Sequence, residues 1–240
     1  MIIFITGGAS GLGEAITRKI ASGNAHKVYF TYCNSESNAK KIELDFPNAF
    51  SLKCDFRDEN EVKAMTEKIA EFNIDVLVNN AYSGKFIDTY FHKSNPNAFE
   101  DEFKINIVPT IKITQAAINF FRKKKYGKIV TILTSALLNT PPVGASVYVA
   151  SKAYLEQLTK VWATENIKFN ITSNSISPSL MLTQLTGGMD ERVIEQIVEN
   201  HPLKKLLTPD EAAESVAFLI NSGQQINGLN IVLNAGTNLK

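Results

Sequence analysis

Short apolar runs rich in β-branched residues alternate along the chain with segments whose apolar positions follow a helical repeat. Runs with the composition of buried strands stand at residues 2–5, 27–32, 49–54, 75–78, 128–133, 170–176 and 230–233. Helical segments are expected at residues 14–20, 35–45, 59–72, 96–121, 148–165, 193–198 and 209–220. Strands that alternate with helices favour one parallel sheet covered on both faces. The pattern therefore predicts a single α/β domain over residues 1–240, built on a doubly wound sheet of about seven strands.

The composition agrees with a globular chain and excludes several functional classes. Of the 240 residues, 44% are hydrophobic, and the formal net charge is +1. Nucleic-acid-binding proteins usually carry a marked basic excess, so this balance argues against nucleic acid as a partner. Cys33 and Cys54 lack the spacing and His neighbours of a metal site, so we expect no metal and two reduced thiols. Since no apolar run approaches a membrane span and the first residues do not resemble a secretion signal, we expect a cytoplasmic protein.

A glycine-rich turn joins the first apolar run to the first helical segment. Residues 6–13 read Thr-Gly-Gly-Ala-Ser-Gly-Leu-Gly. Glycines at such a turn allow tight backbone geometry and let a pyrophosphate approach the free N–H groups of the helix N-terminus. Because the turn directly follows a buried-looking strand, it predicts dinucleotide binding rather than an ordinary turn.

The end of the second apolar run bears on which dinucleotide is bound. Dinucleotide folds often place a carboxylate there to accept hydrogen bonds from the adenosine ribose. Here Thr31 is followed by Cys33 and Asn34, and no carboxylate appears before Glu36. Because a carboxylate would repel a 2′-phosphate, its absence favours NADP(H) over NAD(H). No Arg stands in the glycine turn or at this strand end, so Asn34 and nearby hydroxyls would have to bind that phosphate.

Polar residues also follow later strands, at the edge where doubly wound folds bind ligands. Asp55 comes after the third run and either contacts the adenine or, like Asp58, caps the next helix. Asn79 and Asn80 are either turn residues or braces between strands that line the crevice. Ser135 follows the fifth run and is expected to point into that crevice.

Asn106 lies among apolar residues in the long helical segment at 96–121. A buried amide at this position would need hydrogen-bond partners, whereas an exposed one would lie on a polar face. Pro109 removes a backbone donor and should loosen the helix near Asn106, which would free a carbonyl to hold a water.

Tyr148 and Lys152 stand four positions apart in a helical segment. Residues at that spacing lie on one helix face, and a neighbouring ammonium favours a phenolate. The pair would lower the Tyr148 pKa and make it a proton donor or acceptor near neutral pH. The alternative is a surface Lys beside a half-buried Tyr.

Taken together in this order, these segments resemble the short-chain dehydrogenase/reductase family from Ile2 to about Gly236. Residues 6–13 match its TGxxxGxG pattern, residues 79–81 match most of its NNAG segment, and residues 178–183 match its PGxxxT segment. Tyr82 and Ser179 depart from the family where it has glycine. Tyr82 is expected to crowd the cofactor loop, and Ser179 to need a backbone conformation that glycine takes more easily.

The resemblance implies a Rossmann-type fold and hydride transfer between a nicotinamide and a substrate carbonyl. It implies that Tyr148 donates the proton and that Ser135 orients the carbonyl oxygen. Lys152 would lower the Tyr148 pKa and bind the nicotinamide ribose, and Asn106 would anchor a water in the proton path. The cofactor contacts that it implies are Gly7, Ser10, Gly11, Leu12, Gly13, Thr31, Asp55, Phe56, Asn80, Ala81, Tyr148, Lys152, Pro178, Met181 and Thr183.

The substrate is expected to be set by residues 180–203, a short and moderately apolar segment that suits an acyl chain or another small apolar carbonyl. Its length, compact C-terminus and preference for NADP(H) make the chain most similar to the 3-oxoacyl-(acyl-carrier-protein) reductases of fatty acid biosynthesis. The basic run at residues 122–125, expected at a solvated helix end, would attract an acidic carrier protein if it lay near the site.

Other functions fit the same resemblance. The alternatives are an alcohol, sugar or steroid dehydrogenase of the family, or a cofactor-sensing binding protein that does no chemistry. Relatives associate through the helices that match residues 96–121 and 148–165. Both segments carry apolar residues on more than one side, so we expect a homotetramer or homodimer.

Overall fold

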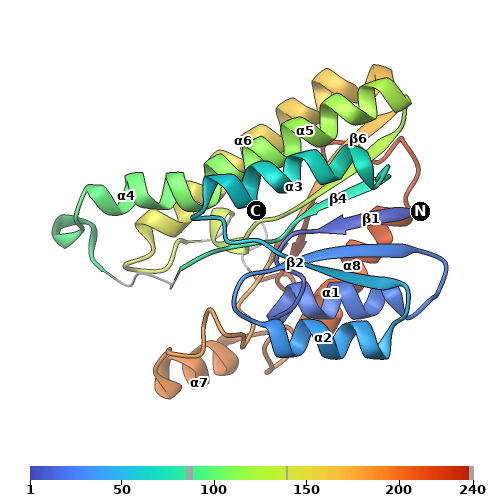
Figure 1. Ribbon diagram of the computed structural model, residues 1–240. Coiled ribbons are helices and arrows are strands. Elements are labelled where there is room, and N and C mark those ends of the chain that lie inside the picture. Colours follow the sequence, from blue (N-terminus) through green and yellow to red (C-terminus); the bar gives the residue numbers. More distant parts are fainter. Residues whose placement is uncertain (85–88, 139, 238–240) are drawn as a thin grey trace.

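The computed structural model describes residues 1–84, 89–138 and 140–237 and contains one parallel sheet (Figure 1). Within this part of the chain the sheet has seven strands in the order β3-β2-β1-β4-β5-β6-β7. The predicted doubly wound α/β fold is confirmed. The strands are β1 (Ile2–Ile5), β2 (Lys27–Tyr32), β3 (Ala49–Lys53), β4 (Val76–Asn79), β5 (Gly127–Ile132), β6 (Ile171–Pro178) and β7 (Asn230–Leu233).

Helices cover both faces of the sheet. Figure 1 shows α1, α2 and α8 below it and α3, α5 and α6 above it. The helices are α1 (Gly11–Ala21), α2 (Glu36–Asp45), α3 (Glu59–Glu71), α4 (Asn97–Glu102), α5 (Val108–Lys124), α6 (Ser146–Asn166), α7 (Glu191–Asn200) and α8 (Pro209–Asn221). In the same view, α4 and α7 stand on either side of the edge where the strands end.

The core has two large clusters, because successive strand side chains point to opposite faces, and a third small one of Ile107, Leu133 and Leu155. On β1, Ile3 and Ile5 pack in the cluster between the sheet and helices α1 and α8. Phe4 packs in the cluster between the sheet and helices α3 and α5. On β4, Val76 and Val78 belong to the first cluster and Leu77 to the second. Strands buried on both faces read as continuous apolar runs, which explains why the sequence pattern located them.

The strand order reverses between β1 and β4, and this reversal places the cofactor crevice. Ligands of doubly wound sheets bind outside the carboxyl ends of strands at such a point. Directly after β1, the Thr6 N–H donates to the Val78 carbonyl of β4 at 3.0 Å, so the start of the glycine-rich turn is still bonded to β4. The glycine-rich turn therefore lies at the switch point of the sheet.

The segment at 96–121 is not one regular helix. A π-helical turn over Phe103–Ile107 separates α4 from α5, and the Val108 N–H bonds to the Phe103 carbonyl. Pro109 has no N–H to continue the α-helical ladder, so the predicted loosening near Asn106 is confirmed. The Asn106 carbonyl accepts a hydrogen bond from Thr110 Oγ1 at 2.7 Å.

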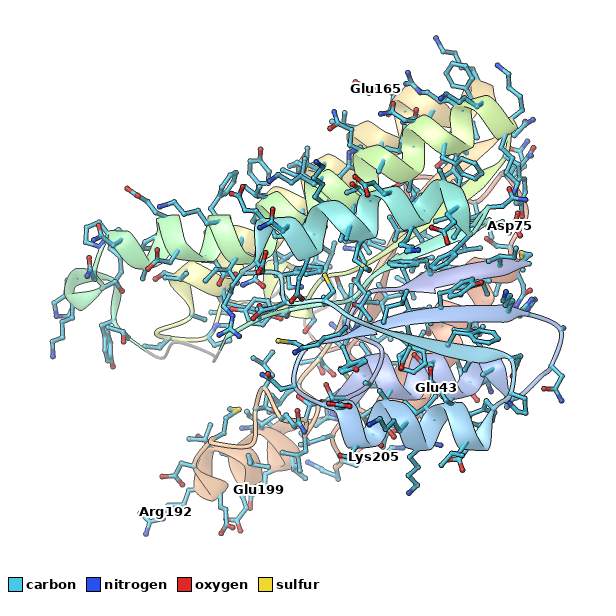
Figure 2. All side chains as sticks on the ribbon, viewed as in Figure 1. Glu43, Asp75, Glu165, Arg192, Glu199 and Lys205 are labelled. Carbon is cyan, nitrogen blue, oxygen red and sulfur yellow. The ribbon has the colours of Figure 1, made fainter. Side chains whose placement is uncertain are left out.

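The basic run at residues 122–125 lies at the wrong edge of the sheet to guide a carrier protein. It closes α5, as predicted, and Lys124 Nζ lies 2.6 Å from Asp75 Oδ1. Asp75 directly precedes β4, at the end of the molecule opposite Arg192 and Glu199 on α7 (Figure 2). The strands begin at this edge and end at the crevice, so the run does not border the site.

Side-chain caps begin α3 and α8, and the cap at Asp58 was expected. Asp58 Oδ1 accepts from the Asn60 and Glu61 N–H groups at the start of α3. Thr208 and Glu211 exchange hydrogen bonds as a capping box at the start of α8. In the described part of the chain, none of the helices has the length and apolarity needed to cross a membrane.

Candidate active site

The glycine-rich turn is packed too closely to admit side chains. A Cβ added to Gly13 would lie 2.0 Å from the Gly7 carbonyl oxygen and 2.4 Å from Asn80 Nδ2. Gly7 and Gly11 have φ values of +66° and +52°, which favour glycine. Ser10, at the N-cap of α1, makes no side-chain cap hydrogen bond, so the first N–H groups of the helix keep their donors for a ligand. These features fit a dinucleotide pyrophosphate.

The loop after β4 braces this turn. Thr6 Oγ1 accepts from the backbone N–H groups of Asn80 and Ala81, both at 3.0 Å. Asn80 Nδ2 donates to the Thr6 and Gly7 carbonyls. Asn79 is buried and donates to Thr114 Oγ1 on α5 at 2.8 Å. Both Asn residues therefore hold neighbouring elements together.

The side that would hold adenosine contains a residue that the sequence analysis missed. Arg57 binds Asp55 through both carboxylate oxygens, with its Nη2 2.6 Å from Oδ2, and these hydrogen bonds lower the pKa of Asp55 to about 2. The same Nη2 lies 3.9 Å from Cys33 Sγ, just beyond the end of β2. The signal was present as an Arg two positions after the Asp. Thr31 is buried and accepts from the Gly7 N–H at 2.9 Å.

Phe56 and Leu12 are buried, so both side chains belong to the core and only their backbone groups are available to a cofactor. Thr183 lies beside the turn, because a Cβ on Gly11 would be 3.3 Å from Thr183 Cβ. Thr186 Oγ1 binds the Met181 carbonyl at 2.6 Å and accepts from the Thr183 N–H at 2.9 Å, which shapes this segment after Pro178.

The concern about Ser179 is unfounded. Its φ is not positive, and its N–H donates to the Leu233 carbonyl at 2.9 Å, so no glycine-like conformation is needed. α7 follows this segment with none of its residues buried, and Val193 on it is 44% exposed.

Tyr148 and Lys152 lie together on α6, with Lys152 Nζ 5.8 Å from the centre of the Tyr148 ring. Lys152 is buried, and its Nζ donates to the Ile132 carbonyl at 2.9 Å at the end of β5. Tyr148 forms a side-chain hydrogen bond with Thr134, the residue before Ser135. Ser135 is itself buried in the short turn that follows β5. The structure thus brings three of the four predicted catalytic residues to one place.

The expected lowering of the Tyr148 pKa is wrong. Burial raises the pKa of Tyr148 to about 12, and this effect outweighs the hydrogen bond with Thr134. Burial also lowers the pKa of Lys152 to about 8. Desolvation penalises the charged form of each group, so the neutral phenol is stabilised and the ammonium is destabilised.

The Asn106 side chain is buried, and both its oxygen and its nitrogen are hydrogen-bonded. Its Oδ1 accepts from the Ser83 N–H at 2.7 Å, and its Nδ2 donates to the Ser83 carbonyl and to Glu102 Oε2, each at 3.0 Å. Tyr82 also donates to Glu102 Oε2, at 3.1 Å. Tyr82 therefore directs its hydroxyl to Glu102, and the sequence analysis missed Glu102. A carboxylate four positions before Asn106 on one helix face was the available signal.

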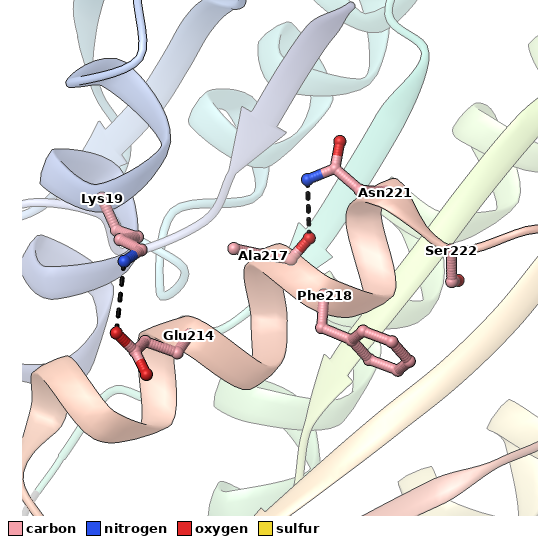
Figure 3. Close-up of a pocket in the computed structure, with 6 residues that line it drawn as sticks. All are labelled: Lys19, Glu214, Ala217, Phe218, Asn221 and Ser222. Carbon is pink, nitrogen blue, oxygen red and sulfur yellow. Dashed lines mark hydrogen bonds and ion pairs between the residues drawn. The ribbon is translucent and has the colours of Figure 1, made fainter.

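A separate surface pocket lies between α1 and α8 (Figure 3). Lys19 Nζ and Glu214 Oε1 are 3.3 Å apart at its rim, and Phe218 lines it. Its far end is at Ser222, whose carbonyl accepts from Lys128 at the beginning of β5. The pocket is thus at the edge opposite the glycine turn and takes no part in the candidate site.

Comparisons with known proteins agree with this geometry. The family model described as Enoyl-(Acyl carrier protein) reductase matches residues 7–238. A 2,3-dihydro-2,3-dihydroxybenzoate dehydrogenase from Bacillus subtilis is 30% identical over 255 residues, covering 99% of this chain and 96% of that protein. A 3-oxoacyl-(acyl-carrier-protein) reductase from Aquifex aeolicus is 30% identical over 243 residues, which cover 98% of this chain and 96% of that protein.

A solved structure, the 3-ketoacyl-(acyl-carrier-protein) reductase from Brucella melitensis complexed with NADH, matches with a TM-score of 0.88 at 24% identity. The match covers 99% of this chain and 98% of that one. It supports the fold described above.

Proposed function

The chain belongs to the short-chain dehydrogenase/reductase family and is an NAD(P)-dependent oxidoreductase, and we propose that it reduces the 3-oxo group of an acyl thioester to a hydroxyl. The observation that carries this proposal is the Tyr148–Lys152 pair, which lies with Ser135 at the carboxyl edge of the sheet, beside the glycine turn. A relative that shares 30% identity over nearly the full length is named for this reaction, which supports the choice of substrate.

In the proposed mechanism, Tyr148 gives its phenolic proton to the carbonyl oxygen, and Ser135 donates a hydrogen bond that orients this oxygen. Bound NAD(P)H would supply the hydride for the carbonyl carbon. Lys152 places a positive charge beside the phenolate that remains after transfer. The Asn106 carbonyl, which accepts from Thr110, has a second lone pair that would hold a water returning protons to Lys152.

We propose NADP(H) as the preferred cofactor. The residues that end β2 and follow it, from Thr31 to Ser35, contain no carboxylate that would repel a 2′-phosphate. Arg57 adds a guanidinium beside Cys33 at this strand end, where the sequence had offered only Asn34 and hydroxyls. Arginine suits phosphate recognition because its planar fork donates several hydrogen bonds.

Residues 180–203 are proposed as the substrate-binding segment. Met181 is partly buried, and Leu182 and Val193 are exposed beside the crevice, so the segment offers apolar contacts to an acyl chain. An acyl carrier protein is the proposed donor of that chain. Because residues 122–125 lie at the far edge of the sheet, the surface of this chain that would bind the carrier protein would lie nearer α4 or α7.

A homotetramer is the proposed assembly. Apolar side chains are exposed along one side of α6, where Tyr154 and Val161 are two turns apart and 44% and 45% exposed. Phe218 on α8 and Val232 on β7 are exposed as well. Exposed apolar side chains on more than one element fit an assembly with two types of interface.

A second candidate is the oxidation of a ring hydroxyl in a cyclic diol. It is favoured by the 30% identity to a 2,3-dihydro-2,3-dihydroxybenzoate dehydrogenase, which equals that of the reductase. The same residues would act in reverse, with Tyr148 accepting the proton as a phenolate.

A substrate panel distinguishes these reactions. The absorbance of reduced nicotinamide should be followed with acetoacetyl thioesters, simple ketones and sugars, and its formation followed with cyclic diols. We expect kcat/KM to be at least about tenfold higher for the thioesters than for any other compound. Higher kcat/KM for the cyclic diol would favour the second candidate. Cofactor binding without turnover of any compound would contradict both and indicate a cofactor sensor.

A further inference from the structure

Glu102 is a buried carboxylate at the end of α4, only 9% exposed. Its Oε2 accepts two hydrogen bonds, from Tyr82 at 3.1 Å and from Asn106 at 3.0 Å. Its Oε1 is also buried and has no donor within the described part of the chain. Both protein donors therefore serve one oxygen, and they leave the negative charge largely uncompensated in a medium of low dielectric.

Tyr82 connects this carboxylate to the catalytic pair. The edge of the Tyr82 ring meets the Tyr148 ring at 83°, with the ring centres 5.4 Å apart. Lys152 Nζ lies 5.6 Å from the centre of the Tyr82 ring. The buried acid, the phenol and the ammonium thus surround one side chain, which stands where the family has a glycine.

We propose that Glu102 is a positioning residue of the active site, whose carboxylate, held by Tyr82 and Asn106, is the countercharge of the Lys152 ammonium. The structure describes both side chains, and they are not in direct ion-pair contact, so the interaction acts through space. The inference deepens the proposed reductase function and rests on it.

The charged and titratable groups around Glu102 make this assignment specific. Tyr82 faces it from the loop after β4, and Tyr148 and Lys152 face it from α6. Burial has the largest effect on all three pKa values, and the negative charge of Glu102 makes a smaller upward contribution to each of them. On its own helix, Glu100 and Asp101 are exposed, and Glu100 lies 3.7 Å from Lys104 on the next turn. These exposed charges are screened by water.

The sign of these effects favours one direction of reaction. Burial alone lowers the Lys152 pKa, and Glu102 opposes that change. Burial raises the Tyr148 pKa, and Glu102 adds to that change. Both contributions keep protons on the pair, which is the state that carbonyl reduction starts from. Oxidation needs a Tyr148 phenolate, so the same charge disfavours it.

The substitution Glu102→Gln removes the negative charge of residue 102 and keeps the shape of its side chain. A glutamine has the same shape, and its amide oxygen can still accept from Tyr82 and Asn106. The pH midpoint of the Lys152 titration, called the Lys152 midpoint below, can be measured by NMR of labelled lysine side chains. The variant Lys152→Met identifies which signal belongs to Lys152. This measurement needs no substrate. The proposal about Glu102 can therefore be refuted while the reductase activity is confirmed, or confirmed while the proposed substrate is refuted.

We expect Glu102→Gln to lower the Lys152 midpoint by about one unit, within the range that Coulomb's law allows for a nearby unit charge. With substrate, the alkaline limb of the kcat/KM profile should move to lower pH by a similar amount. Asp101→Asn is the matched control, because it removes the same charge from an exposed neighbouring position and should leave the midpoint unchanged.

Two further variants keep the test decisive. Glu102→Asp retains the charge and should keep the midpoint near the wild-type value. Tyr82→Phe removes a hydrogen bond but leaves the carboxylate charged, so it should not lower the midpoint. A Lys152 midpoint that is unchanged in Glu102→Gln, or lowered equally by Glu102→Asp and Tyr82→Phe, would overturn the proposal.

Discussion

Arg57 places a guanidinium beside Cys33, just past the end of β2, although the two residues are far apart in sequence. It is held there by Asp55, which it binds through both oxygens. In the proposed complex the same group would contact the 2′-phosphate of NADP(H). A single side chain from the loop after β3 therefore supplies the cation that the strand end lacks.

Arg57→Ala is expected to raise the KM for NADPH about tenfold and to change the KM for NADH much less. The variant loses a charge-assisted hydrogen bond and leaves the Asp55 carboxylate free to repel the phosphate. Steady-state kinetics with both cofactors measure the effect. Arg18→Ala is the control, since Arg18 also forms ion pairs, with Glu14 on α1 and Asp45 on α2. Equal losses for NADPH and NADH would argue against phosphate recognition.

At the residue scale, the sequence indicated which side chains were candidates for the site better than it indicated their burial and contacts. Tyr148, Lys152, Ser135 and Asn106 were selected as candidate catalytic residues because their order and spacing are distinctive. Glu102 was not selected, because its spacing of four from Asn106 does not by itself show that this carboxylate is buried while Glu100 and Asp101 beside it are exposed. The direction of the Tyr148 pKa was wrong for a related reason: burial is a property of the whole fold.

At the scale of elements, helix ends follow from local chemistry. Asp58 was expected as a cap and acts as one, and Thr208 caps α8, because the hydrogen bonds that these side chains accept come from residues within three positions. The split of residues 96–121 into α4, a π-helical turn and α5 was predicted only as a loosening near Asn106. Within this turn the Asn106 side chain is held by Glu102, four positions earlier, and by Ser83 from the loop after β4, a contact that local spacing does not predict.

Thr208→Ala should lower the free energy of unfolding by about 1 kcal/mol, because it removes the capping box of α8. Denaturant unfolding measures this loss. Thr164→Ala removes an exposed hydroxyl inside α6 and should cost less than about 0.5 kcal/mol. Equal effects of the two substitutions would show that the cap contributes nothing specific.

The cap also has an expected pH dependence. Hydrogen bonds from Lys205 and then from Thr208 lower the pKa of Glu211 to about 2. A lowered acid pKa contributes stability above the usual glutamate range, and the contribution disappears as the pH falls toward the folded value. The difference between wild type and Thr208→Ala should therefore be constant near neutrality and shrink in acid.

At the scale of the whole molecule, the layered fold was the most predictable feature. A parallel sheet is buried on both faces, so central strands such as β1 and β4 read as apolar runs, although β6 is rich in Ser and Asn. Right-handed crossovers leave few possible strand orders. The outer surfaces were less predictable. That Tyr154 and Val161 share one exposed side of α6 follows from their spacing, but their exposure depends on how α4 and α5 pack beside them.

Val161→Asp is expected to dissociate the proposed tetramer, because it buries a charge in an apolar interface. Light scattering after gel filtration should report a smaller species than for wild type. Leu44→Asp places the same charge on α2, where Leu44 is 84% exposed, and should not change the mass. A wild-type monomer, or a Val161→Asp protein of unchanged mass, would refute this interface.

The most direct test of the central claim compares wild type with Tyr148→Phe in two measurements on the same preparations. Binding of reduced cofactor should be nearly equal, because the ring of residue 148 is retained. Oxidation of that cofactor with an acetoacetyl thioester should fall by about a thousandfold or more when the proton donor is absent. Turnover by Tyr148→Phe at a rate close to wild type would contradict the account.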